Sequence, residues 1–495
     1  MKKSLFALFM ALTATLATNA EDYTGTIYVT RNGQTNTETA TVNVNQQDNG
    51  LNTLVLRVPF MGQNMVLNMP DVPSATTAGI TTYSAERTVA TGTYFGSMYT
   101  TVFARVTNGM MAANVSIPAY NVTMWFNTVG DHFQLPNSDF EAWTSDNGEP
   151  DRWHGFKSAD GTYAGYSAGL VKLEKSSDIH SGSTGTHSAV MTAGSIFGIV
   201  ANGTMTNGRL MAGSMFATDT KNHAEMDKAN GTDDFYMPLY AKPDKFNVWL
   251  KYQQGTTNAN NKANVSVKTF DGTYYQEPTD KEYTNLSGSI VGGQITAGDW
   301  THYSFPFDYA SYAANGAASE AIFVTFSTNG NPGQGTSGDA LYVDDMELVY
   351  LGNMTDLCYQ GQTIEGWNPA VTAYSIETAG EPNLDDFTAT IEGASAVLTK
   401  SMEQNQDGTY RIAISVVSGD LQNASCYIIT ATSAPDFILG DVNNDGDINI
   451  ADVTALIDYL LSTNDINEQA ADTDCNGSLD IGDVTSLVDI LMSGN

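Results

Sequence analysis

Asp and Asn side chains recur at alternating positions in two stretches near the C-terminus, and each stretch has a glycine, Gly446 or Gly477, at its sixth position. Oxygen donors at positions 1, 3, 5, 7, 9 and 12 of a loop can surround one hard cation, with the seventh residue contributing its backbone carbonyl. A glycine at position 6 allows the sharp turn that such a loop makes. The spacing therefore predicts one Ca²⁺ in each loop, held by Asp441, Asn443, Asp445, Asp447, Asn449 and Asp452, and by Asp472, Asp474, Asn476, Ser478, Asp480 and Asp483.

Each acidic loop leads directly into an apolar pattern with helical spacing. Apolar residues follow the first loop at offsets i, i+3, i+4, i+7 and i+8, which place them on one side of a helix. The same offsets follow the second loop, 31 residues further along the chain. A solvated acidic tail, the alternative reading, has no reason to carry two helices in phase with two loops. The predicted stripes are Val453, Leu456, Ile457, Leu460 and Leu461, and Val484, Leu487, Val488, Leu491 and Met492.

Two Asp-x-Asn/Asp-x-Asp/Asn-Gly loops, each followed by one helix, make residues 438–495 similar to a type I dockerin. That resemblance implies a calcium-dependent module that docks onto a cohesin-like protein, with an internal repeat that can offer two equivalent faces. An Asp at position 12, where a full EF-hand has Glu, fits the family. The chain departs from well-known members at positions 10 and 11, which are Ile450-Ala451 and Ile481-Gly482 instead of Ser-Thr, and at Asp458, where a basic residue is expected.

The composition limits what the rest of the chain can be. Its 495 residues favour three or four domains, at ~150 residues per domain. Charged residues make up only 15% of the chain, which is typical of an extracellular β protein, and the formal net charge is −34. Because nucleic acids and anionic membranes are bound by basic patches, this charge argues against both as partners.

The N-terminus has the features of a secretory signal peptide. Lys2 and Lys3 precede an apolar run over residues 5–17, and Thr18-Asn19-Ala20 follows it, so cleavage is expected after Ala20. The apolar run is too short to cross a bilayer as a helix. We therefore expect an exported protein without a membrane span, either secreted into the medium or held at the cell surface.

Three cysteines are too few for a disulfide framework. Cys358 and Cys426 flank one predicted domain and either form a disulfide or stay reduced, because spacing alone does not fix the distance between their Cα atoms. Cys475 lies at position 4 of the second acidic loop, which is not a ligand position. We expect it to be unpaired and exposed.

Residues 21–130 alternate apolar and polar side chains over short runs that are separated by turn signals. Asn32-Gly33 predicts a tight hairpin, because both residues accept the positive φ of a primed turn. About eight such strands favour a closed barrel or a sandwich. With the opening Asp22-Tyr23-Thr24-Gly25-Thr26, the region resembles the calycin-like β-barrel domains of exported bacterial proteins. Such a barrel either holds an apolar ligand or is filled by its own side chains.

Residues 131–352 begin and end with distinctive motifs. Asn137-x-x-Phe-Glu-x-Trp143 opens the region, and Val343-Asp-Asp-x-Glu-Leu348 closes it. Together with Ser327-Thr-Asn-x-Asn-Pro-Gly333, these motifs resemble carbohydrate-binding jelly rolls and, more narrowly, the putative carbohydrate metabolism domain of secreted bacterial proteins. That family is described as glycoside-hydrolase-like. Asp344-Asp345 interrupts the alternation of the last strand and predicts a bulge there. In jelly rolls such a pair forms turns or supplies ligands to a further structural ion, calcium.

Two kinds of chemistry follow from this resemblance. Sugar binding uses flat aromatic faces beside a few polar groups, and Trp143, Trp153 and Phe156 are the predicted carbohydrate-binding residues, with Tyr274-Tyr275 as a further pair. The alternative is that these rings belong to the core. Glycoside hydrolysis uses two carboxyl groups across the scissile bond. Glu141 is the catalytic candidate, although no local motif pairs it with a second acid.

Residues 353–437 have the pattern of an immunoglobulin-like β spacer. Tyr410, Ile412, Ile414 and Val416 alternate with polar or small residues, as expected for a sandwich strand. The segment 432–435 reads as a short hinge before the acidic loops.

The predicted fold class is therefore mainly β and multidomain. It comprises a β-barrel, a jelly-roll β-sandwich and an Ig-like sandwich, with a small α-helical module of paired half-EF-hands at the end. The predicted function is a secreted protein of polysaccharide binding and degradation, whose central domain engages glycan and whose dockerin docks onto a cohesin-like partner through calcium. Two alternatives remain open: a glycoside hydrolase that cleaves O-glycosyl bonds in the central domain, and a non-catalytic surface-assembly protein.

Overall fold

The computed structural model describes residues 20–60, 63–77, 80–91, 96–107, 109–128, 133–143, 148–196, 198–230, 233–433, 437–462 and 465–493. The predicted signal peptide, apart from Ala20, and hinge residues 434 and 435 lie outside the described residues. The chain divides into two compact units. One comprises the chain up to Thr355 with Thr390–Thr399 and Ser415–Cys426, and the other comprises Asp356–Ala389, Lys400–Ile414 and Tyr427–Asn495.

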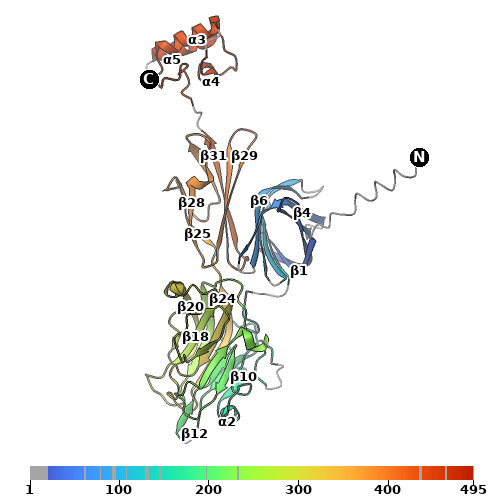
Figure 1. Ribbon diagram of the computed structural model, residues 1–495, viewed down its shortest axis with the longest axis vertical. Helices are drawn as coiled ribbons and strands as arrows, with labels where there is room; N and C mark the ends of the chain where they lie inside the picture. The colour runs from blue at the N-terminus through green and yellow to red at the C-terminus, as the bar shows by residue number, and fades with distance from the viewer. Residues whose placement is uncertain are drawn as a thin grey trace, which may run out of the picture. The chain divides into compact units, whose positions relative to one another are not determined.

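The first nine strands form one antiparallel sheet in the order β4-β3-β2-β1-β9-β8-β7-β6-β5. β4 also packs against β6, so the sheet curls almost into a closed barrel, drawn in blue in Figure 1. The predicted hairpin is present, because Asn32 and Gly33 have φ values of 51° and 78°. The strands are β1 (Ala20–Arg31), β2 (Gln34–Gln46), β3 (Asn52–Phe60), β4 (Gln63–Val72), β5 (Ser74–Thr77), β6 (Ile80–Ala90), β7 (Ser97–Thr107), β8 (Met110–Ile117) and β9 (Val122–Asn127).

The interior of this barrel is packed with its own side chains. Val42 and Val44 on β2 point inward, while the residues between and beside them lie nearer to solvent. Met65, Met111 and Met124 are completely buried. Of the two possibilities that the alternation left open, the structure therefore shows the packed barrel.

The central strands form a long sheet in the order β10-β11-β24-β17-β22-β20-β18-β23-β14, with β21 paired to β18. β22 pairs with β17 over most of its length and with β20 through Phe307 and Asp308, so it joins the two halves of a jelly-roll-like sandwich. The elements are α2 (Ala164–Leu170), β10 (Lys172–Ser176), β11 (Ser188–Thr192), β12 (Gly194–Ile196), β13 (Ile199–Ala201), β14 (Thr204–Thr206), β15 (Arg209–Ala212), β16 (Asn222–Met226), β17 (Lys245–Gln253), β18 (Ala263–Phe270), β19 (Tyr275–Glu277), β20 (Leu286–Ile290), β21 (Gln294–Ile295), β22 (Gly298–Asp308), β23 (Ala321–Ser327) and β24 (Ala340–Val349).

Alternation along β17 decides which of its side chains reach the core. Phe246, Val248 and Leu250 are buried, whereas Trp249 and Lys251 lie on the opposite face. This is the period of two that a strand with one buried face requires. The strand therefore carries a tryptophan on the side that does not face the core.

β24 contains the predicted bulge at its paired aspartates. Its pairing with β17 shifts in register between Asn247 and Trp249, and Asp345 has a φ of 42°. Neighbouring side chains of a regular strand point to opposite faces, and a bulge changes that relation locally. The bulge therefore changes the direction in which Asp344 and Asp345 project.

The next strands form two small sheets. β25, β26 and β28 make one sheet, and the order β27-β31-β30-β29 makes the other, in which β27 runs parallel to β31. Within the described residues Cys358 and Cys426 form no disulfide bond, and Cys475 is exposed as predicted. The strands are β25 (Asn353–Tyr359), β26 (Gln362–Thr363), β27 (Ala373–Thr378), β28 (Phe387–Glu392), β29 (Val397–Gln404), β30 (Tyr410–Val417) and β31 (Ala424–Ser433).

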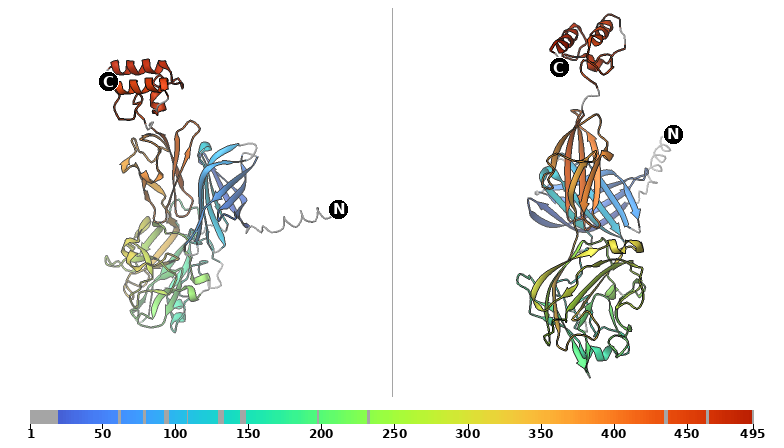
Figure 2. Two further views of the ribbon diagram at one scale, coloured as in Figure 1. Left: turned by 45° about the horizontal axis from the view of Figure 1, so that its top comes forward. Right: turned by 90° about the vertical axis from the view of Figure 1, so that its left-hand side faces the viewer.

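The C-terminal region is helical, with α3 (Ile450–Ser462), α4 (Glu468–Ala471) and α5 (Ile481–Ser493). Figures 1 and 2 show α3 and α5, in red, lying side by side. Both helices begin where the apolar patterns predict. Among the described residues no helix is long and apolar enough to cross a bilayer. The core between the helices consists of Val442, Val453, Leu456, Ala471, Val484 and Leu487.

The two apolar stripes extend beyond this core. Leu461 and Met492, the last residues of the predicted stripes, are 79% and 81% exposed. Each long helix is covered mainly by the other, and one neighbour covers only a narrow part of a helix surface. The uncovered ends of the stripes form an apolar surface that the core does not use.

Candidate functional site

The two acidic loops have the same hydrogen-bond pattern. The Asp452 carboxylate accepts from the backbone N–H groups of Asn443 and Asn449, at 3.0 and 2.8 Å. The carboxylate of Asp483 accepts from the backbone at the same two loop positions, at 3.3 and 2.9 Å. The position-12 aspartate therefore closes each loop onto the first turn of the following helix.

The first residue of each loop organises the sharp turn. Asp441 accepts from the backbone N–H groups of Asp445 and Gly446, both at 3.0 Å. Gly446 has a φ of 91° and Gly477 a φ of 81°, which are values that a residue with a Cβ rarely adopts. The predicted role of glycine at position 6 is thus confirmed.

The loops concentrate negative charge that no basic residue in this region can neutralise. Asp452 and Asp483 are completely buried, and residues 437–495 include no Lys, Arg or His. In the second loop, carboxylate oxygens of Asp472, Asp474 and Asp483 lie within 4.8 Å of one another. Buried carboxylates require a compensating cation, and an all-oxygen donor set suits Ca²⁺. The residues present therefore fit the predicted ion.

The prediction that Trp153 contacts a sugar is wrong. Its ring is 0% exposed, packs against Phe140 and Phe326, and donates from Nε1–H to the carbonyl oxygen of Pro136 at 3.1 Å. Tyr275 is also buried, at 2% exposure. A ring that is enclosed by the core has no face to offer a sugar. Both residues therefore belong to the core, which was the alternative to sugar binding that the sequence left open.

Trp143 and Phe156 are both half-buried and pack against the core of the central domain. The Trp143 indole N–H donates to the carbonyl oxygen of Phe140, and Lys175 Nζ lies 5.6 Å from the centroid of the indole ring. These contacts fix the orientation of the Trp143 ring. Both side chains keep some exposed surface, so their proposed role in sugar binding stays a prediction.

Glu141 is a carboxylate whose oxygens are occupied by nearby donors. It accepts from Thr186 through the backbone N–H at 2.7 Å and the hydroxyl at 2.8 Å, and from His187 through the backbone N–H at 2.7 Å. His187 Nδ1 lies 3.1 Å from the second oxygen. Burial alone would raise the pKa of Glu141, but these side-chain and backbone donors lower it to about 2. These hydrogen bonds connect the loop around residue 186 to the segment that begins the central domain.

We expect Glu141→Gln to flatten the acid dependence of the central domain's stability. Because the pKa of Glu141 lies below its ordinary value of 4.5, the carboxylate contributes stability above about pH 4.5, and that contribution is lost as the pH falls toward 2. The side-chain amide of the glutamine variant would also place its NH₂ group, a donor, where the carboxylate now accepts from the backbone N–H groups of Thr186 and His187. Thermal unfolding at pH 7 and pH 3 measures the difference. Glu174→Gln, which changes a half-exposed glutamate of β10, is the control; equal pH slopes for wild type and Glu141→Gln would contradict the assignment.

A cluster that the sequence did not single out lies on the outer face of β17, β22 and β24. Trp249 is paired in register with His302, and Lys251 with Tyr342, and cross-strand partners share a face. The Trp300 ring lies 6.1 Å from that of Tyr342. The one sequence signal was a tryptophan at a polar position of an amphipathic strand. We call Trp249, Lys251, Trp300, His302 and Tyr342 the outer-face cluster.

Acidic side chains hold this cluster in place. Lys251 Nζ lies 2.9 Å from Asp178 Oδ2 and 3.4 Å from Asp299 Oδ1. The Trp300 indole N–H donates to Asp178 Oδ1 at 2.9 Å. Burial opposes the charge on Asp178, but the hydrogen bonds from Trp300 and Lys251 lower its pKa. Aromatic rings held beside charged groups are the chemistry that a polyhydroxylated ligand uses.

A second acidic group adjoins the outer-face cluster. The His180 ring stacks on Trp249, with centroids 4.1 Å apart and an interplanar angle of 3°. Its Nε2 lies 2.7 Å from Asp345 Oδ2, and Asp344 is completely buried next to it. Burial, and then the negative charge of Asp345, raise the pKa of Asp344 to about 7. Carboxylates therefore gather where the sequence predicted a further structural ion.

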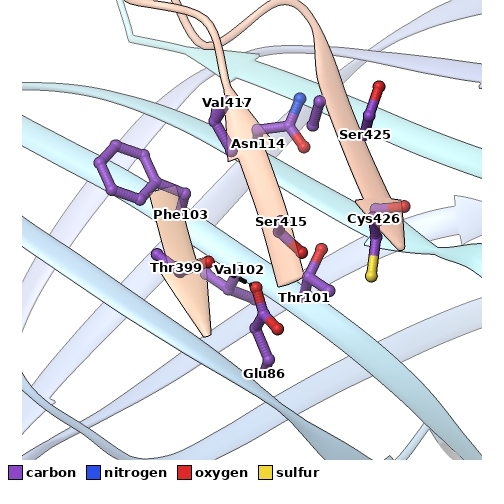
Figure 3. A pocket seen from close by; sticks show the side chains of 12 residues that line it. Glu86, Thr101, Val102, Phe103, Asn114, Thr399, Ser415, Val417, Ser425 and Cys426 are labelled. Atoms are coloured by element: carbon purple, nitrogen blue, oxygen red, sulfur yellow. Dashed lines mark hydrogen bonds between the residues drawn. The ribbon is translucent and has the colours of Figure 1, made fainter. Parts of the chain in front are cut away.

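A small cavity lies in the first unit, between β6 to β8 and the parts of β29 to β31 that belong to the same unit. Figure 3 shows Glu86, Thr101, Thr399 and Ser415 among its lining residues, with Thr399 Oγ1 donating to Glu86 Oε1 at 2.5 Å. Its volume is about 10 Å³. This is room for roughly one water molecule and excludes a sugar ring.

Two family models match the chain. Residues 439–491 match the dockerin type I domain, and residues 123–349 match the putative carbohydrate metabolism domain. No curated protein matches the chain. The calycin-like resemblance of the N-terminal barrel stays a prediction.

Two solved structures are weakly similar to this chain. A putative glycoside hydrolase from Bacteroides thetaiotaomicron is 14% identical, with a TM-score of 0.32 over 51% of this chain and 86% of that chain. The N-terminal CBM22-1–CBM22-2 tandem domain of Xyn10C from Paenibacillus barcinonensis is 12% identical, with a TM-score of 0.21 over 64% and 92%. Likenesses of this size transfer neither ligand nor activity.

Proposed function

We propose that this chain is an exported glycan-binding protein that attaches to a cohesin-like partner through a calcium-dependent dockerin. The observation that carries the proposal is the pair of loops with the same donor spacing, each closed by a completely buried aspartate in a region without basic residues. The predicted signal peptide supports export. The match to the dockerin type I domain supports the attachment.

The surface of the helical region supports docking to another protein. Ile450 and Ile481 are both 71% exposed, and they occupy the same position in the two halves of the repeat. Leu461 and Met492 form a second exposed pair, also 31 residues apart. Large exposed apolar side chains are enriched at protein-binding surfaces. Because each half exposes large apolar side chains at the same two positions, we infer that either half can serve as the docking face.

The central domain supports a role in binding glycan. Trp249, Trp300 and Tyr342 present partly exposed rings on one face of the sheet, beside the charged groups of Lys251 and Asp178. Sugar rings stack on aromatic faces while neighbouring polar groups bond the hydroxyls. The match of residues 123–349 to the putative carbohydrate metabolism domain supports the same class of ligand.

The contacts of Glu141 favour binding over hydrolysis. A glycosidase needs a carboxylic acid that is protonated at the working pH, and a pKa of about 2 leaves Glu141 ionised. Its oxygens are also occupied by Thr186 and His187. Glu141 therefore cannot serve as the general acid of the hydrolase alternative, and its contacts leave little room for an attack on a sugar.

Retention on insoluble polysaccharides tests the proposal. We expect the intact protein to be retained on at least one plant or host glycan, and Trp249→Ala or Trp300→Ala to weaken retention roughly 10-fold, as loss of a central aromatic contact does. Tyr166→Ala, which removes a 71% exposed ring from α2, is the matched control. Retention that is unchanged in both tryptophan variants would contradict the assigned face. Release of reducing sugar by the wild type would favour the hydrolase, and no retention on any glycan would favour a surface-assembly protein.

A further inference from the structure

We propose that the central domain binds one divalent ion of the zinc class through His180, Asp344 and Asp345. Potential ligand atoms of these three residues lie within 4.8 Å of one another. His180 and Asp344 are buried, and the Asp345 side chain is 33% exposed, so only Asp345 gives the group appreciable access to solvent. The inference concerns a site separate from the acidic loops and does not depend on docking.

Asp344 provides the first argument. It is completely buried, and one of its oxygens accepts from the backbone N–H of Asp345 at 3.0 Å. Its other oxygen, Oδ2, is buried without a hydrogen-bond partner among the residues that the structure describes. A buried carboxylate oxygen without a donor is costly to maintain. A cation at the centre of the group would satisfy it.

His180 provides the second argument. Its Nδ1 lies 3.0 Å from the carbonyl oxygen of Ser181, and because a carbonyl only accepts, Nδ1 must carry a proton. In the neutral ring Nε2 then holds a lone pair, and it faces an Asp345 oxygen at 2.7 Å. Two lone pairs that face each other need either a proton or a metal cation between them. Metal-bound histidines characteristically donate their other N–H to a backbone carbonyl in this way.

The backbone explains why two neighbouring aspartates can serve one ion. In a regular strand Asp344 and Asp345 would point to opposite faces. The bulge in β24, with its φ of 42° at Asp345, places oxygens of both near the same imidazole. The ring is itself held flat against Trp249. Backbone and stacking contacts therefore orient all three donors before any ion binds.

The donor set distinguishes the metal from calcium. Ca²⁺ takes oxygen ligands, whereas Zn²⁺ and related ions accept imidazole nitrogen together with carboxylate oxygen. One imidazole and two carboxylates thus fit the zinc class. Without an ion, the same contacts would require a doubly protonated His180 paired with Asp345 and a protonated Asp344, and this alternative binds no metal.

Metal analysis of the intact protein separates these cases. The protein is dialysed against Zn²⁺ with excess Ca²⁺ present, so that the acidic loops are filled, and bound zinc is measured by mass spectrometry. We expect the wild type to retain one more equivalent of zinc than His180→Gln or Asp344→Asn. The affinity loss should exceed the roughly 10–100-fold caused by removing an outer-shell partner. His302→Gln and Asp299→Asn change exposed groups on the same side of the sheet and should retain the wild-type content.

A measurement on the wild type covers the case in which a variant fails to fold. Co²⁺ in place of Zn²⁺, again with excess Ca²⁺, should give a visible absorption that saturates at one equivalent and is displaced by Zn²⁺. Equal zinc content in the wild type, His180→Gln and Asp344→Asn would overturn the proposal. So would a site in the central domain that takes Ca²⁺ but neither Zn²⁺ nor Co²⁺.

Discussion

Removing Ca²⁺ from the intact protein is expected to abolish most of its helical circular dichroism signal while the β signal remains. α3 and α5 are the two long helices among the described residues, and each has in its first turn a buried aspartate that closes an acidic loop. Without an ion, Asp452 and Asp483 would be buried charges with no cation near them. Bound Ca²⁺ stabilises the folded region by about 4 kcal/mol at a thousandfold excess over its dissociation constant.

Substitution should reproduce the effect of the chelator. Asp452→Asn with Asp483→Asn removes one carboxylate from each loop, and we expect Ca²⁺ no longer to restore the helical signal. Asp458→Asn with Asp489→Asn removes two exposed carboxylates from the same helices and is the matched control. If the helices persisted in excess chelator, the calcium assignment would fail.

Trp153→Ala is expected to destabilise the central domain by about 3–5 kcal/mol, the usual cost of truncating a buried tryptophan. The ring is completely buried, contacts Phe140 and Phe326, and donates a hydrogen bond to the backbone of Pro136. The variant therefore leaves a large cavity and an unsatisfied carbonyl. Urea unfolding followed by circular dichroism measures the change.

The control for this substitution is Tyr166→Ala, which removes an exposed ring from the same domain and should change stability by less than about 0.5 kcal/mol. A stability loss for Trp153→Ala no larger than that of the control would contradict the core assignment. Glycan retention by the folded fraction of Trp153→Ala should stay near the wild-type level, since the ring has no exposed face.

The acidic loops could be predicted from the sequence because every ligand is local. Asp441 to Asp452 lie within one short segment, so spacing alone places their oxygens around one centre. The hairpin at Asn32-Gly33 and the bulge at Asp344-Asp345 were predictable for the same reason. In each of these cases neighbouring residues determine the geometry.

The outer-face cluster could not be predicted in this way. Its residues come from β17, β22 and β24, and only strand pairing brings them together. Asp178, which contacts two of them, lies in a loop that is distant in the sequence. The burial of Trp153 in the core could not be predicted for the same reason. The sequence around a tryptophan looks the same whether its side chain faces the core or the solvent. Which of the two occurs depends on packing against residues that are distant in the sequence.

The bulge in β24 also gives the number of residues in that strand a consequence of its own. The apolar residues that face the core have odd numbers up to Val343 and even numbers from Met346 onward, because the bulge adds one residue to the strand. Deleting either Asp344 or Asp345 would restore a strict two-residue repeat in which the same apolar side chains still face the core. Such a deletion would therefore remove one acid from beside His180 while leaving the buried face of the strand intact. Relatives that share this architecture but lack the acidic pair are expected to have a strand that is one residue shorter at this point.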